Sequence, residues 1–216
     1  MSEQLPNLSQ AEEAFEQIIE LSRISLLFAG IERATQYPPG RPENDSEHSF
    51  NLGLVATELA ATYHPDLDSG LVTQFALVHD LPEVYAGDVP SFNLTVDDRI
   101  KKELAEDVAA KQLIKELPPH TSQILARYEE QVELEARFVR FVDKLMPAIT
   151  VTIADEENRD NFFEKFGVTT IEDVKQINER KLEELSSSFP EFTLLIELRR
   201  LVSASALKTF FPDIQT

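Results

Sequence analysis

Imidazole and carboxylate side chains occur on helix faces that are otherwise apolar. His48 lies four residues before Leu52, and Asp143 lies four residues after Val139, so each shares the apolar stripe of its predicted helix. His79 continues a third such stripe. An unpaired polar group in such a place costs about 1–3 kcal/mol, so each of these residues needs a partner. The partner is a hydrogen-bonding group, an opposite charge or a metal ion.

A shared metal ion explains these residues together. Asp80 directly follows His79 and can reach the same ion from a helix end. Two imidazoles and two carboxylates suit a divalent ion such as Mn, Fe, Co, Ni or Zn. Because the chain has no cysteine, thiolate ligands are excluded and a structural zinc site is disfavoured. Taken singly, each histidine fits a hydrogen-bonded core residue, and Asp143 fits a buried ion pair with Lys144.

The composition limits the class of protein. A chain of 216 residues suits one domain. The net charge of −19, without a cluster of basic residues, argues against a nucleic acid polymer as partner but allows a small anionic substrate. No apolar run approaches the ~20 residues of a membrane span. The polar, acidic start does not look like an export signal, so we expect a cytoplasmic protein.

The elements that must position these residues are predicted to be helices almost throughout, because apolar residues recur at spacings of three and four. The helices are expected at 10–36, 46–63, 69–81, 96–116, 122–157, 171–187 and 192–208. Proline-rich loops are expected near 37–46 and 86–95, and stops at Phe189-Pro190 and Phe211-Pro212. The apolar stripe around Asp143 is expected to run from Val132 to Ile153. The remaining histidines, His64 and His120, are expected in surface loops.

The order of short motifs along the chain resembles a known family. The motifs are Glu-His-Ser at 47–49, Val-His-Asp-Leu-Pro-Glu at 78–83, Gly-Asp-Val-Pro at 87–90 and Val-Asp-Lys-Leu at 142–145. Over about residues 20–155 they resemble the HD-domain superfamily of metal-dependent phosphohydrolases, and within it the 5'-deoxynucleotidases. The resemblance implies an all-α helical bundle, with 1–216 as a single HD domain and extra C-terminal helices at about 158–216. It also implies that one divalent ion is bound by His48, His79, Asp80 and Asp143.

The same resemblance assigns roles around the ion. Arg33, fifteen residues before His48, occupies the place of an arginine on the first helix that contacts the substrate phosphate. Glu83 is expected to position or deprotonate the attacking water, and Asp88 to contact the ribose side or carry the leaving-group proton. These two roles are interchangeable. Alternatively, Glu83 orients His79, and Asp88 belongs to a turn after a glycine.

Two details bear on substrate recognition. The segment 41–44 matches an Arg-x-Glu-Asn stretch of the family, whereas Ala34 stands where a tryptophan often follows the phosphate arginine. Nucleoside recognition is therefore expected to differ.

The sequence thus predicts a metal-dependent phosphomonoesterase. The substrate is a (deoxy)nucleoside 5'-monophosphate, the cofactor is one divalent ion (Mn, Co, Fe, Ni, Zn or Mg), and the family implies a homodimer. One alternative is a phosphodiesterase or nucleoside triphosphohydrolase. The scarcity of histidines and basic residues near the motifs disfavours it. The other is a catalytically silent metal-binding scaffold, which would have little need for Arg33, Glu83 and Asp88.

Overall fold

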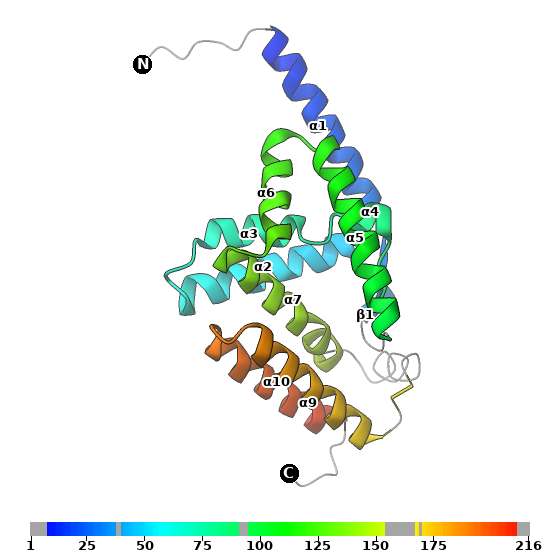
Figure 1. The fold of residues 1–216 in the computed structure, drawn as a ribbon, viewed down its shortest axis with the longest axis vertical. Coiled ribbons are helices and arrows are strands. Elements are labelled where there is room, and N and C mark those ends of the chain that lie inside the picture. Colours follow the sequence, from blue (N-terminus) through cyan, green and yellow to red (C-terminus); the bar gives the residue numbers. More distant parts are fainter. Residues whose placement is uncertain (1–7, 38–39, 91–94, 154–166, 169, 211–216) are drawn as a thin grey trace.

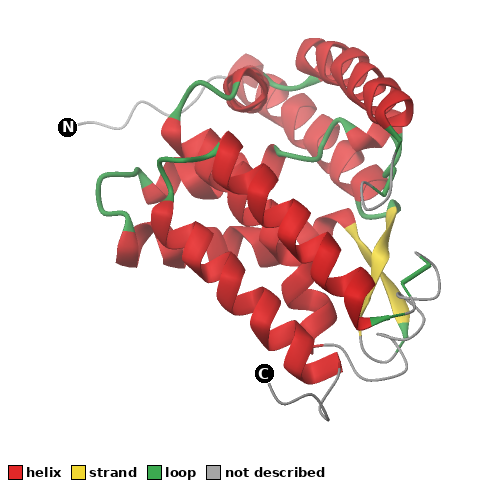
Figure 2. Ribbon diagram, turned by 60° about the horizontal axis from the view of Figure 1, so that its bottom comes forward, coloured by secondary structure: helices red, strands yellow, loops and turns green. Residues whose placement is uncertain are grey.

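The computed structural model describes residues 8–37, 40–90, 95–153, 167–168 and 170–210. Helices dominate it, and one small antiparallel hairpin lies at an edge (Figures 1 and 2). The elements in order are α1 (Leu8–Phe28), β1 (Glu32–Tyr37), β2 (Arg41–Asn44), α2 (Asp45–Tyr63), α3 (Ser69–Val78), α4 (Glu83–Ala86), α5 (Val96–Glu116), α6 (Pro119–Glu130), α7 (Leu134–Ile153), α9 (Ile171–Ser188) and α10 (Thr193–Phe210). The predicted all-α class is confirmed. Within the described ranges, every helix is too short or too polar to cross a membrane.

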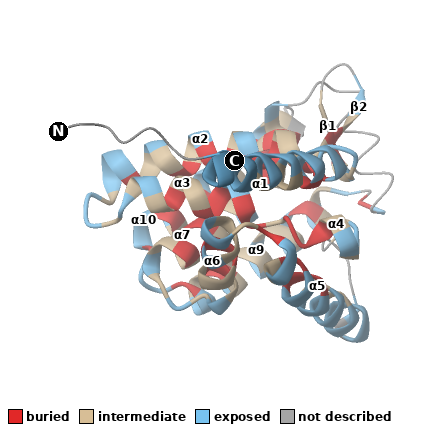
Figure 3. Ribbon diagram, turned by 90° about the horizontal axis from the view of Figure 1, so that it is seen from above, coloured by how far each residue is buried: buried red, intermediate tan, exposed pale blue. Residues whose placement is uncertain are grey.

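The core forms where α2, α3 and α7 pack together, and α7 also packs against α10. Fully buried side chains from these elements meet there, among them Leu52, Phe75, Phe138 and Leu195. In Figure 3 the buried faces converge on this centre, while α1 and α5 lie outside and are mostly exposed. The three central helices therefore form a rigid support for any side chain that projects from their ends.

The predicted first helix, 10–36, is wrong at its end. Helix α1 stops at Phe28, and the chain turns through Gly30 into β1, which pairs with β2. The predicted loop over 37–46 thus contains a strand and the first residues of α2. A strand pair depends on a partner that lies further along the chain, and helical periodicity does not detect it.

The predicted helix 122–157 is also wrong. It is two helices, α6 and α7, separated at Gln131, whose φ of 50° places it in the left-handed region. The predicted apolar stripe is wrong at both ends, since the side chains of Val132 and Ile153 are 76% and 71% exposed. Residues 154–157 lie outside the described part of the chain.

The remaining boundaries agree more closely with expectation. The helix 96–116 is confirmed as α5, and α9 ends just before Phe189-Pro190 as predicted. Helix α3 ends at Val78 rather than at 81, and a tight turn leads through Pro82 into α4. The predicted stop at Phe211-Pro212 lies outside the described residues.

Candidate metal centre

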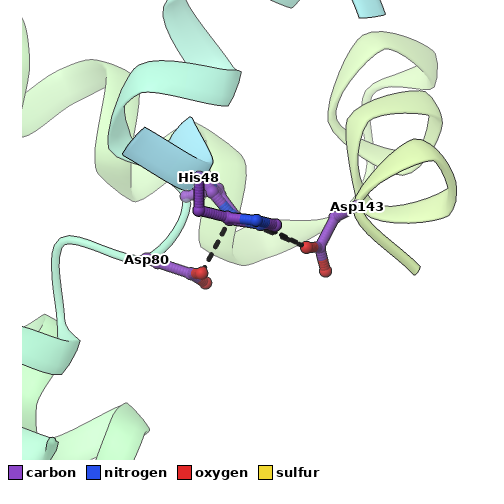
Figure 4. A group of neighbouring side chains, drawn as sticks. His48, Asp80 and Asp143 are labelled. Atoms are coloured by element: carbon purple, nitrogen blue, oxygen red, sulfur yellow. Dashed lines mark hydrogen bonds and ion pairs between the residues drawn. The ribbon is translucent and has the colours of Figure 1, made fainter. Parts of the chain in front are cut away.

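Three elements of the core bring the predicted ligand residues together. His48 lies in the first turn of α2, His79 caps the C-terminal end of α3 with Asp80 directly after it, and Asp143 lies in the middle of α7. One ligand atom from each of the four residues falls within 4.8 Å of the others. Figure 4 shows His48, Asp80 and Asp143 converging from these separate elements.

Local structure fixes the first two ligands. Asn44 caps α2: its side chain accepts from the Glu47 amide at 3.0 Å, and the Glu47 carboxylate accepts from the Asn44 amide at 3.2 Å. This reciprocal pair sets where α2 starts and hence where His48 points. At the other end, α3 gives way to the turn at His79 because Pro82 interrupts the helix. The carboxylate of Asp80 is therefore presented from a turn.

The contacts within the cluster are short. Nε2 of His48 lies 2.9 Å from Oδ1 of Asp143, and Nε2 of His79 lies 3.0 Å from Oδ2 of Asp80. Nε2 of His79 also lies 3.8 Å from Oδ1 of Asp143. The two imidazole rings are 5.4 Å apart between centroids. The four side chains thus face one common point.

The contacts of the two histidine rings orient one nitrogen of each ring toward the candidate metal centre. Nδ1 of His79 lies 2.9 Å from the carbonyl oxygen of Ala76 and donates to it, so Nε2 carries a free lone pair. That buried Nε2 makes no hydrogen bond among the described residues, and Oδ2 of Asp80, 3.0 Å away, faces it as a second acceptor. On His48, Nδ1 lies 3.6 Å from Oε1 of Glu43, a buried carboxylate. Each ring nitrogen that faces the cluster is therefore oriented by a second contact on the opposite side of the ring, as metal-binding histidines usually are.

The electrostatics also favour a cation. Asp45, Asp80 and Glu83 each bring a carboxylate oxygen within 4.8 Å of the others. Burial and the charges of Asp80, Asp45 and Asp88 raise the pKa of Glu83 to about 11. Burial opposes ionisation of His48, yet hydrogen bonds to Asp143 and Glu43 outweigh it and raise the pKa of His48 to about 9. A bound divalent ion would relieve this concentration of negative charge, so the residues present fit a metal.

Arg33 lies beside the cluster, but on strand β1 and not on the first helix as expected. Its Nη1 donates to Asp80 at 2.8 Å and to Asp45 at 3.0 Å. The side chain is 14% exposed. The hairpin, rather than a helix, therefore holds this cation next to the predicted ligands.

The two predicted acids differ in their surroundings. Glu83 is buried in the first turn of α4, and its Oε2 has no hydrogen-bond partner among the described residues. Asp88 is half-buried and follows Gly87, whose φ of 74° allows the sharp turn after α4. Burial raises the pKa of Asp88, and the charges of Arg33 and Lys102 oppose that rise. Both acids therefore lie within electrostatic reach of the cluster.

Sequence reasoning missed two residues at this site. Asp45 is fully buried beside Arg33, and its position between a helix cap and the Glu-His-Ser motif was the available signal. Lys102 on α5 places Nζ 4.0 Å from Oε1 of Glu83 and donates to the Val89 carbonyl at 2.6 Å. No signal in the sequence separates Lys102 from its solvent-facing neighbour Lys101.

The other two histidines lie away from the cluster. His120 is exposed as expected, although it lies in the first turn of α6 rather than in a loop. The surface position predicted for His64 is wrong in part, because it caps α2 and packs edge-on against Phe138 and Phe192.

Two curated proteins are similar to part of this chain. The chain is 30% identical over 109 residues to the 5'-deoxynucleotidase HDDC2 of Bos taurus, covering 48% of this chain and 50% of that protein. It is 32% identical over 92 residues to the 5'-deoxynucleotidase YfbR of Escherichia coli O127:H6, covering 40% and 46%. The chain thus spans about half the length of the curated relatives it matches.

Solved structures extend the similarity over most of the fold. A predicted metal-dependent phosphohydrolase from Magnetospirillum magnetotacticum superimposes with a TM-score of 0.68 at 25% identity, covering 89% of this chain and 92% of that one. The HD phosphohydrolase DatZ of cyanophage S-2L, bound to dA and one catalytic Zn²⁺, gives a TM-score of 0.53 at 20% identity, covering 87% and 96%. A family model described as "HD domain" matches residues 30–188. This chain belongs to the HD-domain family.

Proposed function

We propose that this chain is a metal-dependent phosphomonoesterase that hydrolyses (deoxy)nucleoside 5'-monophosphates to nucleoside and phosphate. The observation that carries the proposal is the convergence of four ligand-type atoms within 4.8 Å, with a cation and a buried acid beside them. The names of the curated relatives support the substrate class, since they are 5'-deoxynucleotidases.

The ligand set that we propose is His48, His79, Asp80 and Asp143. When bound, a divalent ion supplies electrophilic polarisation of a phosphate and activation of water. The mixed nitrogen and oxygen donors accept Mn, Co, Fe, Ni, Zn or Mg. The catalytic Zn²⁺ of the phage protein is one member of this series.

We assign a separate role to each of the residues around the proposed ion. Arg33 binds a phosphate oxygen through its guanidinium, which Asp45 and Asp80 hold in place beside the cluster. Glu83 orients the attacking water from the buried side. Asp88, which is half-buried, holds the proton for the leaving oxygen.

Removing one proposed ligand tests the metal centre. Asp80→Ala and Asp143→Ala should each lose bound metal and hydrolysis of nucleoside monophosphates together. Metal content by elemental analysis and phosphate release with Mn, Co and Mg measure the two effects. Asp68→Ala, which changes an aspartate at the exposed start of α3, should retain both. Turnover at the parent rate in either ligand variant would refute the assignment.

A substrate panel tests the reaction class. Phosphate release should be fast from nucleoside 5'-monophosphates and slow or absent from phosphodiesters and nucleoside triphosphates. A preference for either of the last two would replace the proposed reaction with another of the same family. No turnover on any of them, with metal bound, would indicate a silent scaffold.

Arg33→Ala tests the phosphate contact. It should lower kcat/KM for nucleoside monophosphates by about tenfold or more, since a charge-assisted hydrogen bond contributes about 1.5–3 kcal/mol. Metal content should not change. Unchanged kinetics would show that Arg33 serves only to neutralise Asp45 and Asp80.

We also propose that the chain forms a homodimer through α1. That helix leaves Phe15, Ile18 and Leu26 between 61% and 76% exposed, and a second copy would cover them. Sedimentation of the protein and of Phe15→Glu/Ile18→Glu tests this, since the double variant should be monomeric. A monomeric parent would contradict it. The cytoplasmic location stays a prediction, which cell fractionation tests.

A further inference from the structure

One lysine of α5 faces the candidate site instead of the solvent. Helix α5 packs against α4, the short helix that begins with Glu83 (Figure 1). The side chain of Lys102 on α5 is 18% exposed, whereas that of its neighbour Lys101 is 76% exposed. Burying an ammonium group is costly unless it is paired or hydrogen-bonded. The partners of Lys102 therefore indicate what the residue does.

The ammonium group of Lys102 lies close to three oxygen atoms. Nζ donates to the carbonyl oxygen of Val89 at 2.6 Å and pairs with Oε1 of Glu106, one turn further along α5, at 3.3 Å. It also lies 4.0 Å from Oε1 of Glu83. Burial lowers the pKa of this amine, but the charges of Glu106, Glu83 and Asp88 outweigh burial and raise that pKa overall. The side chain is therefore a charged donor shared between α5, α4 and the segment after α4.

The contact with Val89 holds the segment that carries Asp88. Gly87, with a φ of 74°, turns the chain sharply after α4, and Val89 is 39% exposed. Within the described residues, the backbone hydrogen bonds of this turn end with the bond from the Gly87 amide to the Glu83 carbonyl at 2.7 Å. The hydrogen bond from Lys102 is thus an anchor from outside the turn, on the residue next to Asp88.

The contact with Glu83 acts on the other predicted acid. Glu83 lies beside Asp45 and Asp80, and Arg33 pairs with those two aspartates. In the described part of the chain, Lys102 is the cation that comes within 4.0 Å of the Glu83 carboxyl group. The acidic neighbours repel a negative charge on Glu83, and Lys102 attracts it toward α5. The position of this carboxyl group is therefore set from α5 as well as from α4.

We propose that Lys102 is a positioning residue for the proposed hydrolysis. It holds Asp88 in place through the Val89 carbonyl, and it holds the carboxyl group of Glu83 through its charge. This role rests on the proposed function, in which the two acids orient the water and hold the leaving-group proton. Among the described residues, the oxygen atoms that Lys102 contacts belong to none of the four proposed ligands. Its removal should therefore reduce turnover and leave metal content and substrate affinity unchanged.

Lys102→Met tests the role, since methionine keeps most of the length of lysine but has neither its charge nor its donors. In the full chain with metal bound, kcat for nucleoside monophosphates should fall about tenfold or more, because misplacing a catalytic group by about 1 Å can cost about 100-fold in rate. KM and metal content should stay within about twofold of the parent. Lys102→Arg, which keeps charge and donors, should recover most of the lost turnover. Lys101→Met removes an exposed lysine of the same helix and is the matched control, with the kinetics of the parent.

A double-mutant comparison separates positioning from a general effect on the fold. If Lys102 acts through Asp88, Lys102→Met should cost less turnover in an Asp88→Asn background than in the parent. A structural defect would cost the same in both backgrounds and would lower Tm. Where Lys102→Met does not fold, Lys102→Gln takes its place, since it loses the charge but stays polar.

The outcomes distinguish this role from the proposed function. The assay uses whichever phosphate ester the parent hydrolyses, so another substrate class leaves the comparison of variants intact. Parent-level kcat in Lys102→Met would overturn the positioning role alone, as would an equal loss in Lys102→Arg or an equal loss in both backgrounds. A parent that hydrolyses no phosphate ester with metal bound would overturn the proposed function, and the positioning role with it.

Discussion

Glu43 connects the hairpin to the candidate metal centre, as Arg33 also does. It is 1% exposed and accepts hydrogen bonds from Thr35 and, at 2.8 Å, from the hydroxyl of Tyr37. Its Oε1 also lies 3.6 Å from Nδ1 of His48. Burial opposes its ionisation, but the contacts with His48, Thr35 and Tyr37 prevail and lower the pKa of Glu43. This carboxylate therefore orients the imidazole of His48 from behind.

Replacing Glu43 with glutamine should weaken metal binding. The side chain keeps its size but loses the charge that orients His48, and changes at such supporting positions typically reduce metal affinity about 10–100-fold. Calorimetric titration with Mn or Zn measures it. Glu133→Gln is the control, because Glu133 pairs with Arg127 and does not contact the cluster. Equal affinity in both variants would contradict the positioning role.

At the scale of single residues, the sequence indicated most of the cluster because three of the four predicted ligands, His48, His79 and Asp143, lie in phase with apolar neighbours. His48 and His79 are indeed buried. Periodicity also placed Asp143, 95 residues from His48, toward the interior, and the family resemblance then implied the full ligand set with Asp80. Lys102 could not be predicted, since only the packing of α4 against α5 brings it to Glu83.

At the scale of elements, variants of two helix caps separate an effect on the stability of the fold from an effect on the geometry of the candidate site. Asn44 caps α2, which carries His48, and Asp68 caps α3 at the end away from His79. Asn44→Ala and Asp68→Ala should each lower the free energy of unfolding by about 1 kcal/mol. Only Asn44→Ala should also weaken metal binding. Urea denaturation and metal titration measure the two effects, and equal metal affinity in both variants would show that the cap does not set the position of His48.

The two errors in the predicted elements, at β1 and at Gln131, have a common cause. The residues of β1 (Glu-Arg-Ala-Thr-Gln-Tyr) contain no glycine or proline and continue the preceding helical pattern. They become a strand because β2 lies alongside, and that is a contact between separate segments. The break at Gln131 likewise lacks the glycine that usually marks a left-handed residue. Local propensity therefore located most helices and missed both features.

At the scale of the whole molecule, Phe138 joins the elements of the core. Its ring, fully buried, packs edge-on against Phe192, which directly precedes α10, at 5.4 Å between centroids and against His64 at 5.1 Å. Phe138→Ala should lower the free energy of unfolding by about 3–5 kcal/mol. Phe50→Ala, at a site 65% exposed, should change it by less than about 0.5 kcal/mol. Similar losses in urea denaturation would place Phe138 outside the cooperative core.

The negative net charge of the chain leads to a separate prediction about salt. With 39 acidic and 20 basic residues, folding brings like charges together. Raising NaCl from about 10 mM to about 150 mM shortens the screening distance from about 30 Å to about 8 Å, and Tm should therefore rise. Scanning calorimetry measures it. A fall in Tm would mean that surface ion pairs such as Arg127–Glu133 outweigh the repulsion.

The distribution of the ligand residues along the chain has a consequence for biosynthesis. The proposed ligands lie on α2, at the end of α3 and on α7, so the last of them is translated long after the first. A ribosome-bound chain that ends before α7 lacks Asp143 and has only part of the ligand set. The complete proposed ligand set therefore exists only after α7 has emerged, and metal shortage should leave a full-length chain without its ion rather than an arrested nascent chain.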